Sequence, residues 1–323
     1  MIKKGYFLLL FLLLTQLLLA QSPLLDQWFL NNYLINPAIT GIERFMDVQL
    51  GSRYQWTGVD GAPTSHFISA HSPIGNIRSK KGFTKTPSPS SPDEYSYQKF
   101  KFEPHHGIGG IIYIDQIGPF TNFELNGSYA LHLALNQSLF LSTGFSLGFI
   151  RRYLNMNAIS TSLQADPAIA NFNPDMSLSV RPGIWLYGDR FYLGGSVSEF
   201  IDSEDQKELR SSILTAGYRF DSKAESLHIT PYGLLRLNSI KKHYDIGLKI
   251  DWKRQVYIGG TYRSTNETVL YLGSSINYFL GFTYLFNVGP RSTFTNGSGG
   301  THEIQLSFRF KNKEKISCPQ KMW

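Results

Sequence analysis

Residues 31–75 read NNYLINPAITGIERFMDVQLGSRYQWTGVDGAPTSHFISAHSPIG, and this stretch decides the fold. From Met46 onward, apolar and polar side chains alternate along the chain. The apolar set is Met46, Val48, Leu50, Tyr54 and Trp56, and the polar set is Asp47, Gln49, Gly51, Arg53 and Gln55. A period of two residues is typical of a β-strand with one apolar and one polar face. The pattern predicts such a strand over 46–57.

Turn-forming residues flank this strand on both sides. Pro37 fixes its own φ and pushes Asn36 towards extended geometry, and Gly41 can adopt a positive φ. We therefore expect a bent entry into the strand. Beyond the strand, residues 59–63 (VDGAP) form a turn, and a second strand runs from Thr64 to about Ser72. Together these elements predict a β-hairpin.

The same stretch resembles the opening of the PorP/SprF family. The residues that carry this resemblance are Asn36-Pro37-Ala38, Gly41, Arg53, Gln55-Trp56, Gly58, Asp60-Gly61-Ala62-Pro63 and His71. Later runs are also similar, among them Gly107-Ile108-Gly109-Gly110, Gly118-Pro119-Phe120, Ser128-Tyr129-Ala130, Phe191-Tyr192-Leu193-Gly194-Gly195, Gly259-Gly260-Thr261-Tyr262-Arg263, His302-Glu303-Ile304 and Cys318-Pro319. The resemblance covers most of the chain, and the chain departs from it at residues 76–104 and at Ser179-Val180-Arg181-Pro182.

The N-terminus has the pattern of a secretory signal peptide. Lys3 and Lys4 precede an almost wholly apolar run, and Ala20 offers a small residue before cleavage at Gln21. A transmembrane anchor is the alternative, but the run is short for a membrane span and no stop-transfer charges follow it. We therefore expect residues 1–20 to be removed.

Composition favours a membrane barrel. The chain has 23 Phe, 18 Tyr, 5 Trp and 29 Gly, and its one cysteine, Cys318, cannot form an intramolecular disulfide. After Ala20, no apolar run reaches the ~18 residues that a transmembrane helix needs. Export, abundant aromatic residues and the lack of such a helix predict a transmembrane β-barrel, with a soluble β-sandwich or propeller as the alternative.

Positive charge is confined to two segments. Residues 76–104 and the tail 311–323 each carry a net charge of +3, and the rest of the chain after residue 20 sums to −1. The first segment is rich in Ser, Pro and Lys, which predicts a solvated low-complexity loop inserted into the barrel. Nucleic-acid binding would need this charge on a folded face with stacking aromatic residues, so we expect no nucleic-acid partner.

The rest of the chain reads as strand after strand, which predicts an all-β, antiparallel, up-and-down barrel over 46–310. We count about 14 strands, at 46–57, 64–73, 106–115, 121–134, 138–151, 175–187, 190–200, 209–220, 227–237, 243–252, 255–264, 267–275, 278–287 and 302–310. Most have about 9–13 residues, long enough to cross a bilayer when tilted. Residues 21–45 form an N-terminal arm that packs on or inside the barrel. An even strand number places both termini in the periplasm.

The polar faces of these strands supply candidate lumen residues. They are Arg53, Gln55, Arg181, Lys249, Asp251, Glu303 and Arg309. Two interpretations stay open: a structural hydrogen-bonded network that fills the barrel, or a surface that binds a plug or a partner peptide. Pro182 lacks the N–H that a sheet ladder needs, so we expect a bulge or a break in its strand.

Two patterns point weakly to enzyme or metal chemistry. Gly144-Phe145-Ser146-Leu147-Gly148 matches the G-x-S-x-G pattern of serine hydrolases, but that motif needs a strand-to-helix turn and here lies within a strand. His66, His71 and the adjacent His105-His106 could suggest a metal site, yet a five-residue offset puts the first two on opposite faces of a strand. We therefore predict no catalytic, metal or cofactor site.

The resemblance implies a function in the outer membrane. PorP/SprF proteins belong to type IX secretion and gliding motility, and they act as non-enzymatic accessories. The implied role is to help attach large secreted surface proteins, which carry a C-terminal signal domain, or gliding adhesins, and to couple to a periplasmic, peptidoglycan-associated component. Asn36, Pro37, Gly41, Trp56, Gly61 and Pro63 are its structural motif residues. The alternatives are a passive porin or transport channel and, less in keeping with the sequence, a barrel enzyme.

Overall fold

The computed structural model describes residues 28–75, 104–136, 138–155, 176–201, 211–222, 226–238, 242–253, 255–289 and 298–312. The signal peptide, most of the 76–104 insertion, and the tail beyond Asn312 with Cys318 lie outside the described residues. The strands are β1 Met46–Tyr54, β2 Thr64–Ile74, β3 His105–Ile117, β4 Phe120–Ala134, β5 Leu139–Leu154, β6 Met176–Gly188, β7 Phe191–Ile201, β8 Ser211–Tyr218, β9 Phe220–Asp221, β10 Leu227–Asn238, β11 Lys242–Trp252, β12 Val256–Arg263, β13 Glu267–Ser275, β14 Leu280–Val288 and β15 Thr301–Phe310.

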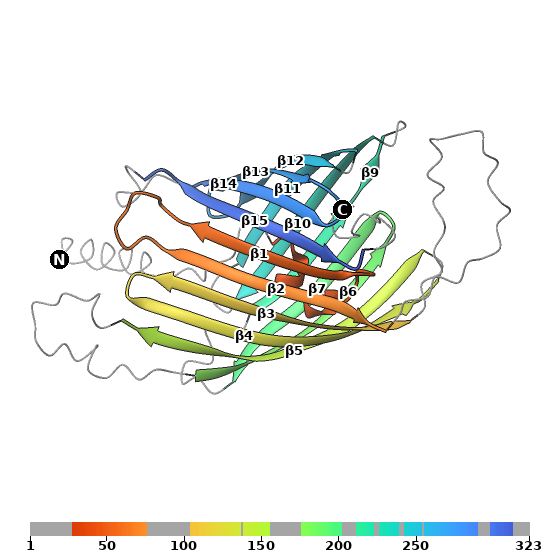
Figure 1. Ribbon diagram of the computed structural model, residues 1–323, viewed down its shortest axis with the longest axis horizontal. Helices are drawn as coiled ribbons and strands as arrows, with labels where there is room; N and C mark the ends of the chain where they lie inside the picture. Colours follow the sequence, from red (N-terminus) through yellow and green to blue (C-terminus); the bar gives the residue numbers. More distant parts are fainter. Residues whose placement is uncertain are drawn as a thin grey trace, which may run out of the picture.

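These strands form one closed antiparallel barrel (Figure 1). Each strand pairs with its neighbours in the chain, and β15 pairs with β1 to close the sheet. The short β9 continues β8 after a one-residue interruption and pairs with β10 in the same register. The barrel therefore has fourteen strands, and the predicted fold class and strand count are confirmed.

Alternation separates the two surfaces of the wall. The inward side chains of β15, such as Glu303 and Gln305, are buried, whereas the outward Ile304 and Phe310 are exposed. Exposed aromatic side chains gather near both rims of the outer surface. One group is Tyr218, Phe220, Trp252, Tyr278, Phe279 and Phe310, and the other is Tyr54, Phe120, Tyr153, Tyr244 and Tyr262. Two aromatic girdles around an aliphatic belt are what a bilayer selects.

The two rims differ in their connections. The C-terminal rim is the barrel end where β1 begins and β15 ends, and the connection of residues 75–104 joins β2 to β3 there. The other connections at this rim are short. The opposite rim carries the connection from β5 to β6, which spans residues 155–175, and the connection from β14 to β15, which spans residues 289–300.

The structure corrects one predicted strand boundary. β1 ends at Tyr54 rather than at residue 57, because the chain turns sharply and Trp56 adopts a φ of +45°. Gln55 therefore lies beyond the strand, where its N–H donates to the Pro63 carbonyl oxygen over 3.0 Å. Gly61, with a φ of +71°, supplies the positive φ that this connection needs.

The irregularity expected at Pro182 is a break without a bulge. β6 and β7 pair at Val180↔Glu199 and again at Gly183↔Ser196, in one unchanged register, and the two positions between them are unpaired. Because proline has no N–H, the ladder loses bonds there without inserting a residue.

The chain before β1 lies inside the barrel. Residues 28–45, called the arm below, include two 3-10 helices, η1 Asn32–Leu34 and η2 Pro37–Ile39, and η2 contacts β4, β5 and β6 (Figure 1). Trp28, Ala38, Ile39 and Thr40 are fully buried. The described residues contain no helix with the length and apolar character to cross a membrane.

Candidate functional site

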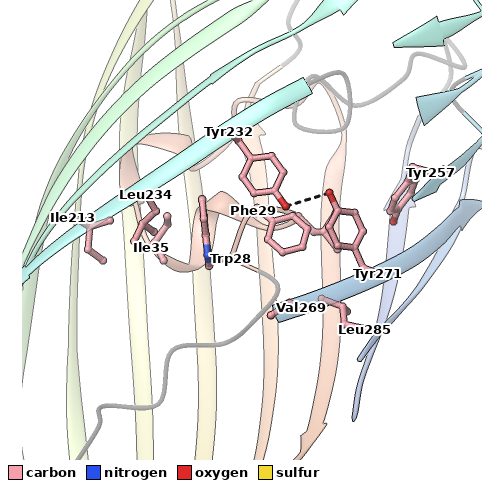
Figure 2. Close-up of a cluster of buried hydrophobic side chains, with 11 residues drawn as sticks. Trp28, Phe29, Ile35, Ile213, Tyr232, Leu234, Tyr257, Val269, Tyr271 and Leu285 are labelled. Atoms are coloured by element: carbon pink, nitrogen blue, oxygen red, sulfur yellow. Dashed lines mark hydrogen bonds between the residues drawn. The ribbon is translucent and has the colours of Figure 1, made fainter. Parts of the chain in front are cut away.

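The arm begins in an aromatic cluster on one side of the lumen. Figure 2 shows the Phe29 ring between Tyr232 of β10 and Tyr271 of β13. The Phe29 and Tyr232 rings stack with centroids 5.0 Å apart, and the Phe29 and Tyr271 centroids are 4.5 Å apart. Tyr232 donates a hydrogen bond to the Tyr271 hydroxyl over 3.2 Å. Such aromatic packing anchors the first described residues of the arm to the strands of the C-terminal half.

A charged network surrounds the Trp28 indole. Trp28 Nε1 donates to Asp245 Oδ2 over 2.9 Å, and Arg263 Nε donates to the same carboxylate oxygen over 3.3 Å. Asp245 is three residues into β11 from its start at the opposite rim. The arm therefore runs from the half of the lumen near the opposite rim to the C-terminal rim, where β1 begins.

Asn36 joins the arm to the broken ladder. Its side-chain oxygen accepts from the Ala38 N–H and caps η2, while Nδ2 donates to the Ile184 and Gly195 carbonyl oxygens at 3.0 and 3.1 Å. Ile184 and Gly195 face each other across β6 and β7, next to the break at Pro182. One amide side chain thus both shapes the turn of the arm and fixes it to the wall.

Side chains of the wall hold the arm by its main chain. They donate to carbonyl oxygens of the arm from Arg181 to Leu34, from Ser196 to Ile35, from Ser142 to Ala38, from His132 to Thr40 and from His105 to Gly41. Buried carbonyl groups need such partners, since no regular ladder supplies them in this irregular segment. The inner wall between β3 and β7 is therefore complementary to the backbone of the arm.

Three buried histidines surround the Thr40-Gly41 turn, and we call His71, His105 and His132 the histidine latch. The Gly41 N–H donates to His71 Nδ1 over 3.1 Å. His105 Nε2 donates to the Gly41 carbonyl oxygen over 3.0 Å, and His132 Nε2 donates to the Thr40 carbonyl oxygen over 2.9 Å. The His105 and His132 rings stack in parallel at 4.5 Å.

Glycines on the wall make room for the arm. Gly41 has a φ of +73°, and its Cα lies against Gly107 of β3, where any Cβ would overlap the Thr40 carbonyl group. A Cβ on Gly144 of β5 would lie 2.6 Å from the Pro37 carbonyl oxygen. Gly183 likewise faces the Asn36 side chain. These glycines permit the close backbone approach between the arm and the wall, and we call the wall residues that contact the arm the seat.

The predicted lumen residues lie on the inner wall, except Gln55. Arg53, Lys249, Asp251, Glu303 and Arg309 are buried, and Arg53 faces Glu303 in the β1–β15 register. Lys249 Nζ is 3.9 Å from Asp251 Oδ2. Arg181 contacts the arm: besides its bond to Leu34, it donates to Ser198 Oγ over 2.8 Å and lies 3.4 Å from Glu124.

The motifs weighed for enzyme and metal chemistry lie within strands of the barrel wall. Ser146 is buried on the inner face of β5, within a strand, and Gly144 of the same motif seats the arm. His66 and His71 lie on opposite faces of β2, because His66 bonds to Ser52 while His71 points inward to the arm. Within the described ranges, no group of three His, Cys, Asp or Glu side chains is arranged to hold a metal ion.

Sequence reasoning did not predict which wall residues contact the arm, although the family resemblance includes His71 and Gly107. The residues of the seat are Ser142, Ser196, Gly107, Gly144, Gly183 and the histidine latch. The period of two places these residues on the inward face of the wall, but it does not show what they contact.

Several solved structures of outer-membrane proteins and channels are distantly similar to the chain. No curated protein sequence matches the chain. Among solved structures, Omp33 of Acinetobacter baumannii is 11% identical with a TM-score of 0.47, over 84% of this chain and 100% of that one. The CymD monoaromatic hydrocarbon channel is 10% identical with a TM-score of 0.47, over 90% and 94%. The P. putida toluene transporter TodX is 9% identical with a TM-score of 0.45, over 85% and 92%.

The sequence profile of one family covers nearly the whole chain. That profile, described as type IX secretion system membrane protein PorP/SprF, matches residues 18–308. The match includes the arm, its seat on the wall and all fourteen strands up to Phe308. The chain therefore belongs to the PorP/SprF family of type IX secretion system membrane proteins.

Proposed function

We propose that this chain is a closed, non-enzymatic outer-membrane barrel that assists the display of large secreted proteins or gliding adhesins at the cell surface. It does so by coupling this cargo, through its rims, to a periplasmic, peptidoglycan-associated component. The observation that carries the proposal is the arm, which lies in the lumen and is bonded to both sides of the wall.

The filled lumen argues against a passive porin. A barrel of fourteen strands encloses a space too wide for its own side chains to fill, since about eight strands already reach that limit. Here Trp28, Phe29, Tyr33, Ile39 and Ile42 of the arm occupy that space and are buried. A closed barrel acts through its rims.

The charge distribution supports an orientation with the C-terminal rim in the periplasm. The two segments with a net charge of +3, residues 76–104 and 311–323, both connect to this rim. Most connections at the rim are short, as periplasmic turns are, and the opposite rim has the connection of residues 155–175. A concentrated positive charge favours an acidic periplasmic partner. The N-terminus before Trp28 lies outside the described residues, so its predicted periplasmic location stays a prediction.

Deletion of the protein tests the proposed function. Surface proteomics of the deletion strain should show the loss of one or a few large type IX cargo proteins, while the other cargo proteins are displayed normally. Loss of all type IX secretion would instead place the chain in the core machinery. Normal display with reduced uptake of a small solute would support the porin alternative, as would a large conductance of the purified barrel in planar bilayers.

A further inference from the structure

The histidine latch joins three neighbouring strands to one turn of the arm. His71 lies on β2, His105 on β3 and His132 on β4, and all three are buried. Each ring bonds to the main chain of Thr40 or Gly41, at the C-terminal rim end of the arm. The turn that they hold leads directly into β1, so the latch sits where the arm meets the barrel.

The hydrogen-bond partners determine which ring nitrogens of the histidine latch carry protons. A backbone N–H can only donate, so His71 Nδ1, which receives the Gly41 N–H, carries no proton. Carbonyl oxygens can only accept, so Nε2 of His105 and of His132 each carries one. His132 Nδ1 is 3.2 Å from the Tyr187 hydroxyl, which can donate to it. The observed contacts are satisfied by three neutral rings.

Protonation of these rings opposes the observed contacts. A proton on His71 Nδ1 would face the Gly41 N–H, and the charged ring would be drawn towards Asp47, whose Oδ2 is 4.0 Å from Nε2. Within the described chain, His71 Nε2 has no hydrogen-bond partner that would resist this movement. Charging both His105 and His132 would stack two cations at 4.5 Å, where like charges repel.

Besides the histidines, Thr40 Oγ1 bonds to Ser128 Oγ of β4 over 2.9 Å, and the other groups around the latch contact the rings rather than the turn. Tyr33 of the arm lies edge-on to His71 with ring centroids 4.6 Å apart, and its hydroxyl bonds to Ser128. Asp47 of β1 already accepts from Gln49 over 2.8 Å. On β6, Tyr187 faces His132, and Glu43 of the arm acts electrostatically on Tyr187. Asp47 is thus placed to attract a charged His71.

We propose that the histidine latch is an acid-sensitive switch that releases the Thr40-Gly41 turn from the lumen wall. Three neutral rings hold the turn, and charging His71, or His105 and His132 together, releases it. Because three rings hold the same two residues, the released fraction of the turn should change steeply with pH. The proposal rests on the contacts of the arm and is independent of the proposed secretion function.

Hydrogen exchange measured by mass spectrometry on the full-length protein in detergent tests the switch. The peptide over residues 38–45 is compared at pH 7.5 and pH 5.0, after correction for the intrinsic exchange rate. Its protection should fall roughly tenfold or more at the lower pH, as expected when buried hydrogen bonds are lost. Protection of β15 and heat-modifiable migration should stay unchanged, which separates release from unfolding.

Matched variants assign the effect to the latch. The triple variant His71→Gln, His105→Gln and His132→Gln keeps donors and acceptors but cannot take up protons, so its protection should be nearly equal at both pH values. His66→Gln, on the outer face of β2, should behave as the wild type. Unchanged protection in the wild type at pH 5.0, or an equal loss in a folded triple variant, would overturn the proposal.

A disulfide lock gives a second, independent result. Thr40 Oγ1 and Ser128 Oγ are 2.9 Å apart, so Thr40→Cys with Ser128→Cys, in a Cys318→Ser background, can link the turn to β4. The oxidised protein should keep its protection from hydrogen exchange at pH 5.0. After reduction of the disulfide, the protection at pH 5.0 should again be lost. If the oxidised protein loses protection like the wild type, the turn does not leave the wall and the proposal fails.

Discussion

Trp28 Nε1 lies 2.9 Å from Asp245 Oδ2, and this bond joins positions 217 residues apart in the chain. It links the start of the arm to β11, while Asn36 and the histidine latch link the rest of the arm to β3, β4, β6 and β7. The arm therefore bridges opposite sides of the wall and forms the hydrophobic core of the barrel.

Trp28 should be among the most costly side chains to truncate. Trp28→Ala removes a fully buried indole and leaves Asp245 without one donor, so we expect a loss of about 3–5 kcal/mol of stability. The shift from folded to unfolded migration on SDS gels should occur at a lower temperature. Trp252→Ala, at an outward position with 63% exposure, is the control and should shift it less. Equal shifts would show that the arm does not stabilise the barrel.

Gly144 should not tolerate even one methyl group. In Gly144→Ala the new Cβ would lie 2.6 Å from the Pro37 carbonyl oxygen, which forces the arm away from β5 and costs about 1–3 kcal/mol. Gly127→Ala is the matched control, because at that outward position the nearest atom is 3.9 Å away. Urea titration of both folded variants measures the difference. A Gly144→Ala barrel as stable as the control would contradict the described seat.

Arg53 and Glu303 should matter more for display than the outer face of the same strand pair. The two residues oppose each other on the inner wall. The double variant Arg53→Met with Glu303→Gln therefore removes both of their charges from the inner wall. We expect this variant to display less cargo, measured by surface labelling. Leu306→Ile, on the outer face of β15, is the control, and only variants with heat-modifiable migration are compared. Equal display would show that the inner charges serve the fold alone.

Protease cleavage of the basic segment, residues 76–104, reports the orientation of the barrel in the outer membrane. It connects β2 to β3 at the C-terminal rim, which we place in the periplasm, so protease added to intact cells should spare it. Permeabilising the outer membrane should expose it to cleavage, detected with an antibody to the C-terminus. Cleavage in intact cells would reverse the orientation.

Much of the barrel followed from the sequence because its walls meet two different surroundings. Lipid outside and polar groups inside give the period of two along β15, from Glu303 to Phe310, and the strand count and faces follow from that period. The predicted end of β1 was wrong because the alternating pattern continues through Trp56. There the positive φ of Trp56, rather than hydrophobicity, ends the strand.

The seat of the arm could not be predicted from the same periodicity. Its contacts join the main chain of Leu34 to Gly41 with side chains as distant as Ser196, and a main chain leaves no pattern of side chains to read. Periodicity shows that His71 and Ser142 face inward, but it does not show what they touch. The resemblance marked Asn36, Pro37 and Gly41, and the contacts of Asn36 and Gly41 with the wall explain why these residue types are needed there.

Cross-linking in native outer membranes tests most directly that the arm lies in the lumen against the wall. In a Cys318→Ser background, Thr40→Cys paired with Ser128→Cys should form a disulfide in high yield under mild oxidation, because the two native oxygens are 2.9 Å apart. The yield is read as protection from a thiol-reactive mass tag. Thr40→Cys paired with Tyr129→Cys, on the outer face of the same strand, should not react. A low yield for the inward pair, or equal yields for both pairs, would contradict an arm seated in the lumen.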